Sequence, residues 1–216
     1  MIRRAALFPV VLLALTAAGC ISVGGGGDPV DDRAYDLVPP LRSDPVPESA
    51  GLETLEVASF TVDPALDRDE LVWRRGPVEI GGYAHHRWAR PPAEAARSFV
   101  ADALHRAGVC SVVATDPAPE RADYVLRAHL SRCEEVDGEE GWTGVVELRV
   151  VVVRPAGREE ILRRVYARSV PAAVRNPGAV VEAIGQALES IGEDLAADLG
   201  MVLEAERAGF GGGGGM

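Results

Sequence analysis

Hydrophobic side chains recur along this chain with two different periods, which separate expected helices from expected strands. Between residues 93 and 107 the apolar positions are three and four apart, the period of one helix face. They are Ala96, Phe99, Val100, Ala103, Leu104 and Ala107. Pro91 and Pro92 precede this segment and Gly108 follows it. The pattern therefore predicts an amphipathic helix that begins at a proline turn and stops at a glycine.

A second and longer helical period begins after Asn176 and Pro177 and ends near Arg207. Its apolar side consists of Val180, Ile184, Ala187, Leu188, Ile191, Leu195, Leu199, Val202 and Leu203. A helix of roughly 30 residues would be ~45 Å long, which exceeds the width of a small domain. We therefore expect its end to project, with an apolar stripe that either packs in the core or pairs with a partner.

Strands are expected where apolar and polar residues alternate or where β-branched residues gather. Residues 124–132 give the clearest alternation, with Tyr124, Leu126, Ala128 and Leu130 in step and polar residues between them. Further strands are predicted over residues 52–62, 70–74, 78–80, 109–114, 143–154 and 161–170, with Gly81 and Gly82 breaking the chain after the third. The last three strands form a predicted meander. The fold class is α+β, with a mostly antiparallel or mixed sheet, two helices on one face and the order β-β-β-α-β-β-β-β-α.

The N-terminus has the layout of a secretory signal. Arg3 and Arg4 precede an apolar run over residues 5–16 that is shorter than the ~20 residues needed to span a bilayer. Ala17, Ala18 and Gly19 before Cys20 resemble the lipobox of bacterial lipoproteins, which implies cleavage after residue 19 and a diacylglyceryl and palmitate anchor on Cys20. The alternative is an ordinary cleaved signal with a leftover thiol. Four glycines follow, and a glycine-rich chain is a flexible tether.

Charge and cysteine usage narrow the function class. The formal charge is −11 and becomes two units more negative without Arg3 and Arg4, so nucleic-acid binding and electrostatic membrane adhesion are disfavoured. Cys110 and Cys133 remain once Cys20 is lipidated, and in an exported protein they could form a disulfide. No cofactor is predicted.

Catalytic and metal-binding patterns are missing from the sequence. It contains no GxSxG elbow, no phosphate-binding glycine loop and no HExxH. The four histidines, His85, His86, His105 and His129, are expected to be ordinary residues and not metal ligands. The acidic run over residues 134–141 lacks the spacing of a calcium loop and is expected to be a solvated hairpin loop. We therefore predict a protein that is not an enzyme.

Several short motifs carry a family resemblance. Leu66-Asp67-Arg68 follows the first strand, Arg87-Trp88-Ala89 precedes the first helix, and Tyr35-Asp36-Leu37 matches a short opening strand. With these motifs the chain resembles the auxiliary lipoproteins of ABC-type transport systems, of the paraquat-inducible protein C type. The resemblance moves the start of the domain from residue 52 to residue 34, and it turns part of the expected linker into an edge strand.

The resemblance implies an outer-membrane lipoprotein that faces the periplasm of a Gram-negative bacterium. Its expected partners are an MCE-domain protein and an inner-membrane ABC permease and ATPase, which together move phospholipid or other hydrophobic molecules between the membranes. The chain would contact the membrane only through its anchor, and it could form homo-oligomers. The alternative is an envelope-assembly lipoprotein, either an activator of a peptidoglycan synthase or a partner of a lipopolysaccharide-exporting barrel.

The expected organisation is therefore a signal over residues 1–19, a tether over 20–33, one domain over 34–207 and a disordered glycine-rich tail over 208–216. Docking is expected through an exposed strand edge and through the apolar surface of the last helix. Trp73 and Trp88 are candidates for either the core or an interface, and core packing is the favoured interpretation.

Overall fold

A computed structural model describes residues 31–41, 53–115 and 122–211. Five strands precede the first described helix, and four lie between the two helices. The elements are β1 (Arg33–Tyr35), β2 (Thr54–Val57), β3 (Thr61–Val62), β4 (Glu70–Arg75), β5 (Glu79–Trp88), α1 (Pro92–Arg106), β6 (Val112–Ala114), β7 (Tyr124–Asp137), β8 (Trp142–Arg154), β9 (Glu159–Pro171) and α2 (Pro177–Gly211). The α+β class and the mixed sheet predicted from the sequence are confirmed.

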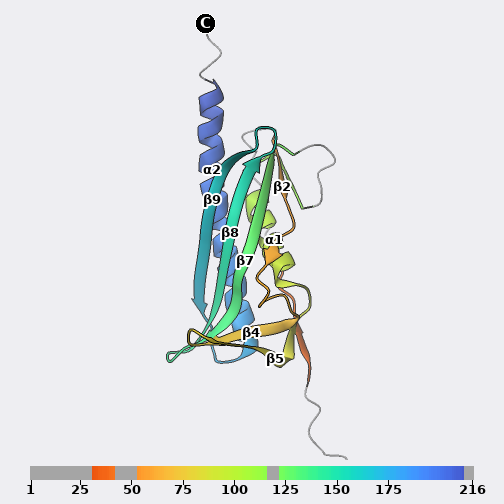
Figure 1. Ribbon diagram of the computed structural model, residues 1–216, viewed down its shortest axis with the longest axis vertical. Coiled ribbons are helices and arrows are strands. Elements are labelled where there is room, and N and C mark those ends of the chain that lie inside the picture. Colours follow the sequence, from red (N-terminus) through yellow and green to blue (C-terminus); the bar gives the residue numbers. More distant parts are fainter. Residues whose placement is uncertain (1–30, 42–52, 116–121, 212–216) are drawn as a thin grey trace, which may run out of the picture. The chain divides into compact units, whose positions relative to one another are not determined.

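The sheet is organised around β7, which has different partners on its two edges (Figure 1). Along one edge β7 pairs antiparallel with β8, and β8 pairs antiparallel with β9, as the predicted meander requires. Along the other edge β2, β3 and β4 follow one another, each parallel to β7. The single strand predicted over residues 52–62 is therefore two short strands, β2 and β3, which pair with successive parts of one neighbour.

The remaining strands extend the sheet beyond β2 and β4. β6 pairs in parallel with β2, β5 pairs antiparallel with β4, and β1 pairs in parallel with β5. β1 is the edge strand expected from the Tyr35-Asp36-Leu37 resemblance, and it starts at Arg33.

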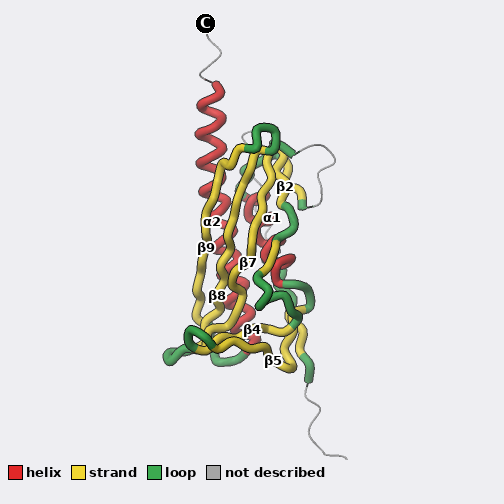
Figure 2. Tube along the Cα trace, viewed as in Figure 1, coloured by secondary structure: helices red, strands yellow, loops and turns green. Residues whose placement is uncertain are grey.

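Both helices lie on the same face of the sheet formed by β7, β8 and β9, as predicted (Figures 1 and 2). α2 packs on β8 and β9 and also contacts α1. Two glycines permit these close approaches: a Cβ on Gly144 would lie 2.8 Å from the amide nitrogen of Ile184, and a Cβ on Gly192 would lie 2.8 Å from the Cβ of Ala103. The core between the layers is made of fully buried aliphatic side chains such as Leu126, Leu148, Ile184, Leu188 and Leu195.

A β-bulge in β7 changes which side chains reach this core. Leu130 lies opposite Leu148 and Arg132 lies opposite Glu147, so Ser131 is the extra residue. Side-chain alternation shifts by one position at the bulge. Before the bulge the side chain of Leu130 points towards the helices, and after the bulge those of Cys133 and Glu135 do so.

The predicted break at Gly81 and Gly82 is wrong, because both glycines lie inside the ten-residue strand β5. Trp73 on β4 is paired with Gly81, and a Cβ on Gly81 would lie 2.3 Å from Cζ2 of the Trp73 ring. The glycine therefore makes room for an indole from the neighbouring strand.

The prediction of an acidic loop over residues 134–141 is also wrong for the first half of that segment. Glu134 and Glu135 belong to β7 and are only 1% and 2% exposed. The turn between β7 and β8 occupies residues 138–141 alone.

The start of α2 and the end of α1 agree with their sequence signals, whereas α2 continues to Gly211, past its predicted end near Arg207 and into the tail over 208–216 that was expected to be disordered. Asn176 caps α2, because its Oδ1 accepts a hydrogen bond from the amide of Ala179 at 2.9 Å. Gly108 follows α1 with a φ of 63°, the left-handed conformation that favours glycine at this position. The last turns of α2 extend past the ends of the strands in the view of Figure 1, in agreement with the expected projection.

Candidate docking surfaces

Neither a metal-binding cluster nor an activated thiol is found among the described residues. Among them no group of three or more His, Cys, Asp or Glu side chains could hold a metal ion. Burial raises the pKa of the Cys110 and Cys133 thiols to about 12, so the reactive thiolate form is suppressed at neutral pH. Three surfaces of the sheet and the helices are candidates for function.

The predicted disulfide is not formed, since Cys110 and Cys133 are both buried and free. Cys110 lies beside the start of β2, where the amide of Ser111 donates to the carbonyl of Glu53. The neighbouring Leu55 pairs with Tyr124, at the first residue of β7. Cys133 lies nine positions further along β7, about 30 Å away at ~3.3 Å per residue. A disulfide needs Cα atoms closer than about 7 Å.

The other predicted site residues have different outcomes. Cys20, the predicted lipidation site, lies outside the described residues. Trp88 is only 6% exposed and belongs to the core, which leaves no ring surface for an interface. Trp73 is half-buried, and the guanidinium carbon of Arg75 lies 5.5 Å from its ring centroid.

The free edge of β9 is one candidate docking surface. Within the part of the chain that the structure describes, β9 pairs only with β8, so one edge of a 13-residue strand carries unpaired backbone groups. Its helix-facing side chains bind α2: the Tyr166 hydroxyl donates to Asp198 at 2.8 Å, and Arg164 and Arg168 form ion pairs with Asp198 and Asp194. These contacts hold the strand in place while its edge stays accessible. The exposed strand edge expected from the sequence is present.

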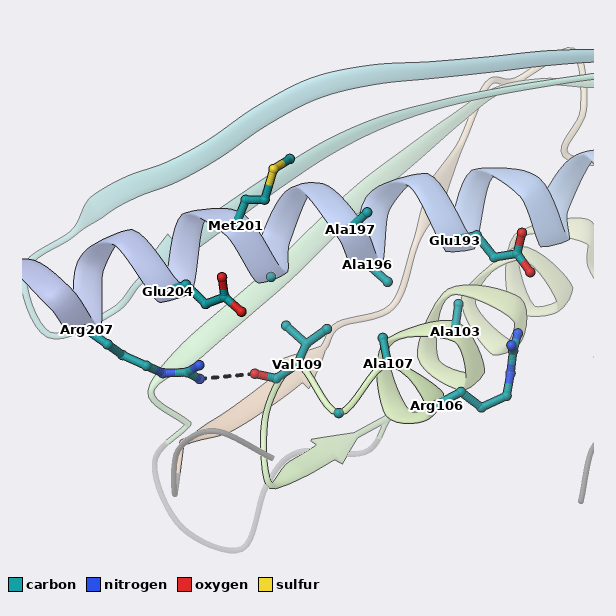
Figure 3. A pocket seen from close by; sticks show the side chains of 12 residues that line it. Ala103, Arg106, Ala107, Val109, Glu193, Ala196, Ala197, Met201, Glu204 and Arg207 are labelled. Carbon is teal, nitrogen blue, oxygen red and sulfur yellow. Dashed lines mark hydrogen bonds between the residues drawn. The ribbon is translucent and has the colours of Figure 1, made fainter. Parts of the chain in front are cut away.

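A groove between α1 and α2 is a second candidate (Figure 3). It has a volume of about 460 Å³ and is lined at its rim by Arg106, Glu193, Glu204 and Arg207. Arg207 closes one end by donating to the carbonyl of Val109 at 3.1 Å and to the carboxylate of Glu53 at 3.0 Å. The hydrogen bond from Arg207 lowers the pKa of the Glu53 carboxyl below its usual range. Equal numbers of acidic and basic side chains leave this groove without a preferred charge for a partner.

The face of β7, β8 and β9 opposite the helices, called the outer face here, is a third candidate. The alternation in residues 124–132 predicted that Arg127 and His129 point to a wet side, and both stand between buried residues that face the helices. The sequence did not predict which side chains of β8 and β9 lie on the outer face. Those residues come from strands whose pairing register is set by the three-dimensional fold.

Comparisons with known proteins identify the kind of protein. The model of the family described as ABC-type transport auxiliary lipoprotein component matches residues 35–196. No curated protein matches the chain. None of the described helices combines the length and hydrophobicity needed to cross a membrane.

Solved structures with the same fold include two that cover most of this chain. The crystal structure of protein XCC0632 from Xanthomonas campestris, of the DUF330 family, is 20% identical, superposes with a TM-score of 0.71, and covers 82% of this chain and 99% of its own. The crystal structure of an uncharacterized protein is 15% identical, with a TM-score of 0.64 and coverage of 78% and 99%.

Proposed function

This chain belongs to the family of ABC-type transport auxiliary lipoprotein components, and we propose that it docks an MCE-domain protein with its ABC permease and ATPase. The complex would move phospholipid or other hydrophobic molecules between the inner and outer membranes. The chain acts as a lipid-anchored scaffold in the periplasm, held at the outer membrane through Cys20, and performs no covalent step itself.

The family match is the observation that carries this proposal, and three features of the molecule support it. The described residues present accessible surfaces without an activated nucleophile or a metal cluster. The lipobox-like sequence at Cys20 and the glycines after it would let an anchored domain stand away from the membrane. A free strand edge on β9 is a ready site for pairing with another chain.

The test is affinity purification of the full lipidated chain from its own envelope, crosslinked before detergent is added, with mass spectrometry of the captured proteins. Recovery of an MCE-domain protein together with a permease and an ATPase is the expected result. Recovery of a peptidoglycan synthase or a lipopolysaccharide-exporting barrel, without transporter subunits, would contradict the proposal and favour the envelope-assembly alternative.

A further inference from the structure

The outer face gathers basic side chains from three neighbouring strands into one patch. Arg127 on β7 lies opposite Val151 on β8, and Val151 lies opposite Arg163 on β9. In the next row on this face, Arg149 of β8 stands between His129 and Val165. Neighbouring strands are about 4.8 Å apart, so Arg127 and Arg163 are separated by about 10 Å with Arg149 between them along the diagonal.

A hollow of about 400 Å³ lies over this patch, and no carboxylate is among the residues that line it. Its basic lining consists of Arg127, His129, Arg149 and Arg163, and its floor includes the apolar Val151. Thr61 orients the histidine, with its hydroxyl 2.9 Å from Nδ1 of His129. Three arginines, two of which have a carboxylate partner in Glu147 or Glu160, leave the patch net positive on a chain whose formal charge is −11.

The arginines of the patch are available to a partner. Arg127 has no ion pair among the described residues. Arg149 pairs with Glu147 at 3.2 Å and Arg163 pairs with Glu160 at 2.5 Å, and all four side chains are at least partly exposed. Such surface ion pairs stabilise a fold by only about 0–1 kcal/mol, so an incoming carboxylate can replace them at little cost.

The composition of the patch favours a protein partner over a lipid. Arginines alternate with half-buried or exposed valines, which are Val125, Val151, Val153 and Val165. Protein interfaces combine an apolar centre with arginine. Small-molecule sites bury most of the ligand in a cleft or cavity, whereas this hollow is open along the flat face of a sheet.

We propose that the outer face of β7, β8 and β9 is a docking surface for an acidic segment of a partner protein, in which Asp or Glu side chains reach the arginines and small apolar side chains contact the valines. Elsewhere the acidic surface of this chain repels the same segment, so the patch also fixes the orientation of the complex. This inference deepens the proposed docking function and rests on it.

The test places a photo-crosslinking amino acid at Val165, which is 57% exposed on the outer face. The full chain is irradiated in its own envelope, and the attached peptide is sequenced by mass spectrometry. The same amino acid at Met201, in the groove between the helices, serves as the positional control. We expect the Val165 adduct to be a peptide with an excess of Asp and Glu.

Charge dependence is tested with two triple variants. R127A/R149A/R163A should lower the Val165 adduct by about tenfold or more, which corresponds to ~1.4 kcal/mol of binding, and leave adducts at Met201 unchanged. R33A/R68A/R87A removes the same charge from exposed residues outside β7, β8 and β9 and the turns that join them, and should leave the Val165 adduct unchanged.

A lipid adduct, a basic or uncharged peptide, a second copy of this chain, or no adduct at Val165 would each overturn the inference. An adduct yield that R127A/R149A/R163A does not lower would also overturn it. An acidic peptide from a protein outside the transport system would uphold the docking surface and contradict the proposed function. Capture of transporter subunits by affinity purification, without a Val165 adduct, would uphold the proposed function and contradict the docking surface.

Discussion

Glu134 and Glu135 are neighbours in sequence and are both buried, but their carboxylates lie on opposite faces of β7. Glu134 receives hydrogen bonds from Arg74 at 2.8 and 3.1 Å and from Arg132 at 2.7 Å. Glu135 is hydrogen-bonded by the Tyr83 hydroxyl at 2.8 Å. Burial raises the pKa of the Glu135 carboxyl, against the lowering effect of the Tyr83 hydrogen bond. At neutral pH the two adjacent carboxylates therefore act in opposite directions: Glu134 stabilises the fold through its arginine partners, and the buried charge of Glu135 lowers stability.

Replacement of Glu135 by Gln should remove a pH-dependent loss of stability. A raised folded-state pKa means that the folded protein holds the proton more tightly than the unfolded chain, so stability falls as the pH rises from the unfolded pKa through the folded one. Gln cannot ionise and still accepts from Tyr83. Thermal unfolding of E135Q should therefore show a higher Tm than wild type at pH 8 and no such gain at pH 4. A lower Tm at pH 8 would contradict this account.

The adjacent substitution Glu134→Gln should act in the opposite direction at neutral pH. It removes the carboxylate that Arg74 and Arg132 share, and loss of one partner from a buried charge cluster costs about 2–4 kcal/mol where the remaining charges are partly exposed. Urea unfolding at pH 7.5 should show a lower midpoint for E134Q than for wild type. An unchanged midpoint would mean that the two arginines find other partners.

Gly81→Ala tests the cross-strand fit between β4 and β5. The added Cβ would meet the Trp73 ring at 2.3 Å, so the indole must leave its place. Overpacking of this kind costs about 1–3 kcal/mol. Urea unfolding followed by tryptophan fluorescence should show a lower midpoint and an altered native emission for G81A. Gly141→Ala is the matched control, because a Cβ there would meet nothing within 4 Å.

At the scale of elements, the contact between α1 and α2 depends on one glycine. A Cβ on Gly192 would lie 2.8 Å from the Cβ of Ala103 and 3.3 Å from the carbonyl oxygen of Phe99, whereas a Cβ on Gly200 would meet nothing within 4 Å. Both glycines lie inside α2 and carry the same helix-propensity cost of about 0.5–1 kcal/mol relative to Ala. G200A should therefore raise the urea midpoint, and G192A should lower it by forcing the helices apart. An equal rise of the urea midpoint in G192A and G200A would contradict this expectation and show that α1 moves to make room for the added methyl group.

The sequence predicted those elements whose signals are local. Helices α1 and α2, with their proline starts and apolar stripes, and the meander of β7, β8 and β9 could all be predicted because period and turn residues lie within each segment. The parallel pairing of β2, β3 and β4 with one edge of β7 could not be predicted, because it joins residues up to about 70 positions apart. The bulge at Ser131 has no local signal either, and it determines that Glu135 is buried.

The candidate surfaces also include features that the local sequence predicts and features that it does not. The wet side of residues 124–132 and the projecting end of α2 follow from periodicity alone. The arginine patch requires the register that places Arg127, Val151 and Arg163 in one row, and that register is a property of the folded sheet. The disulfide prediction failed for a related reason, because the spacing of Cys110 and Cys133 in sequence says nothing about their positions at distant points of the fold.

For the whole molecule, the proposed lipid anchor on Cys20 would determine where every docking surface can act. A Cys20→Ser chain keeps the domain but loses the thiol that would carry the lipid, so it should move from the membrane fraction to the soluble periplasmic fraction. Cys110→Ser is the control for loss of a thiol and should stay with the membrane. The proposed docking role requires that C20S fold normally, with unchanged urea unfolding, yet fail to support transport by its system. A soluble C20S protein that supports transport fully would mean that the partner, and not the lipid, holds this domain in place.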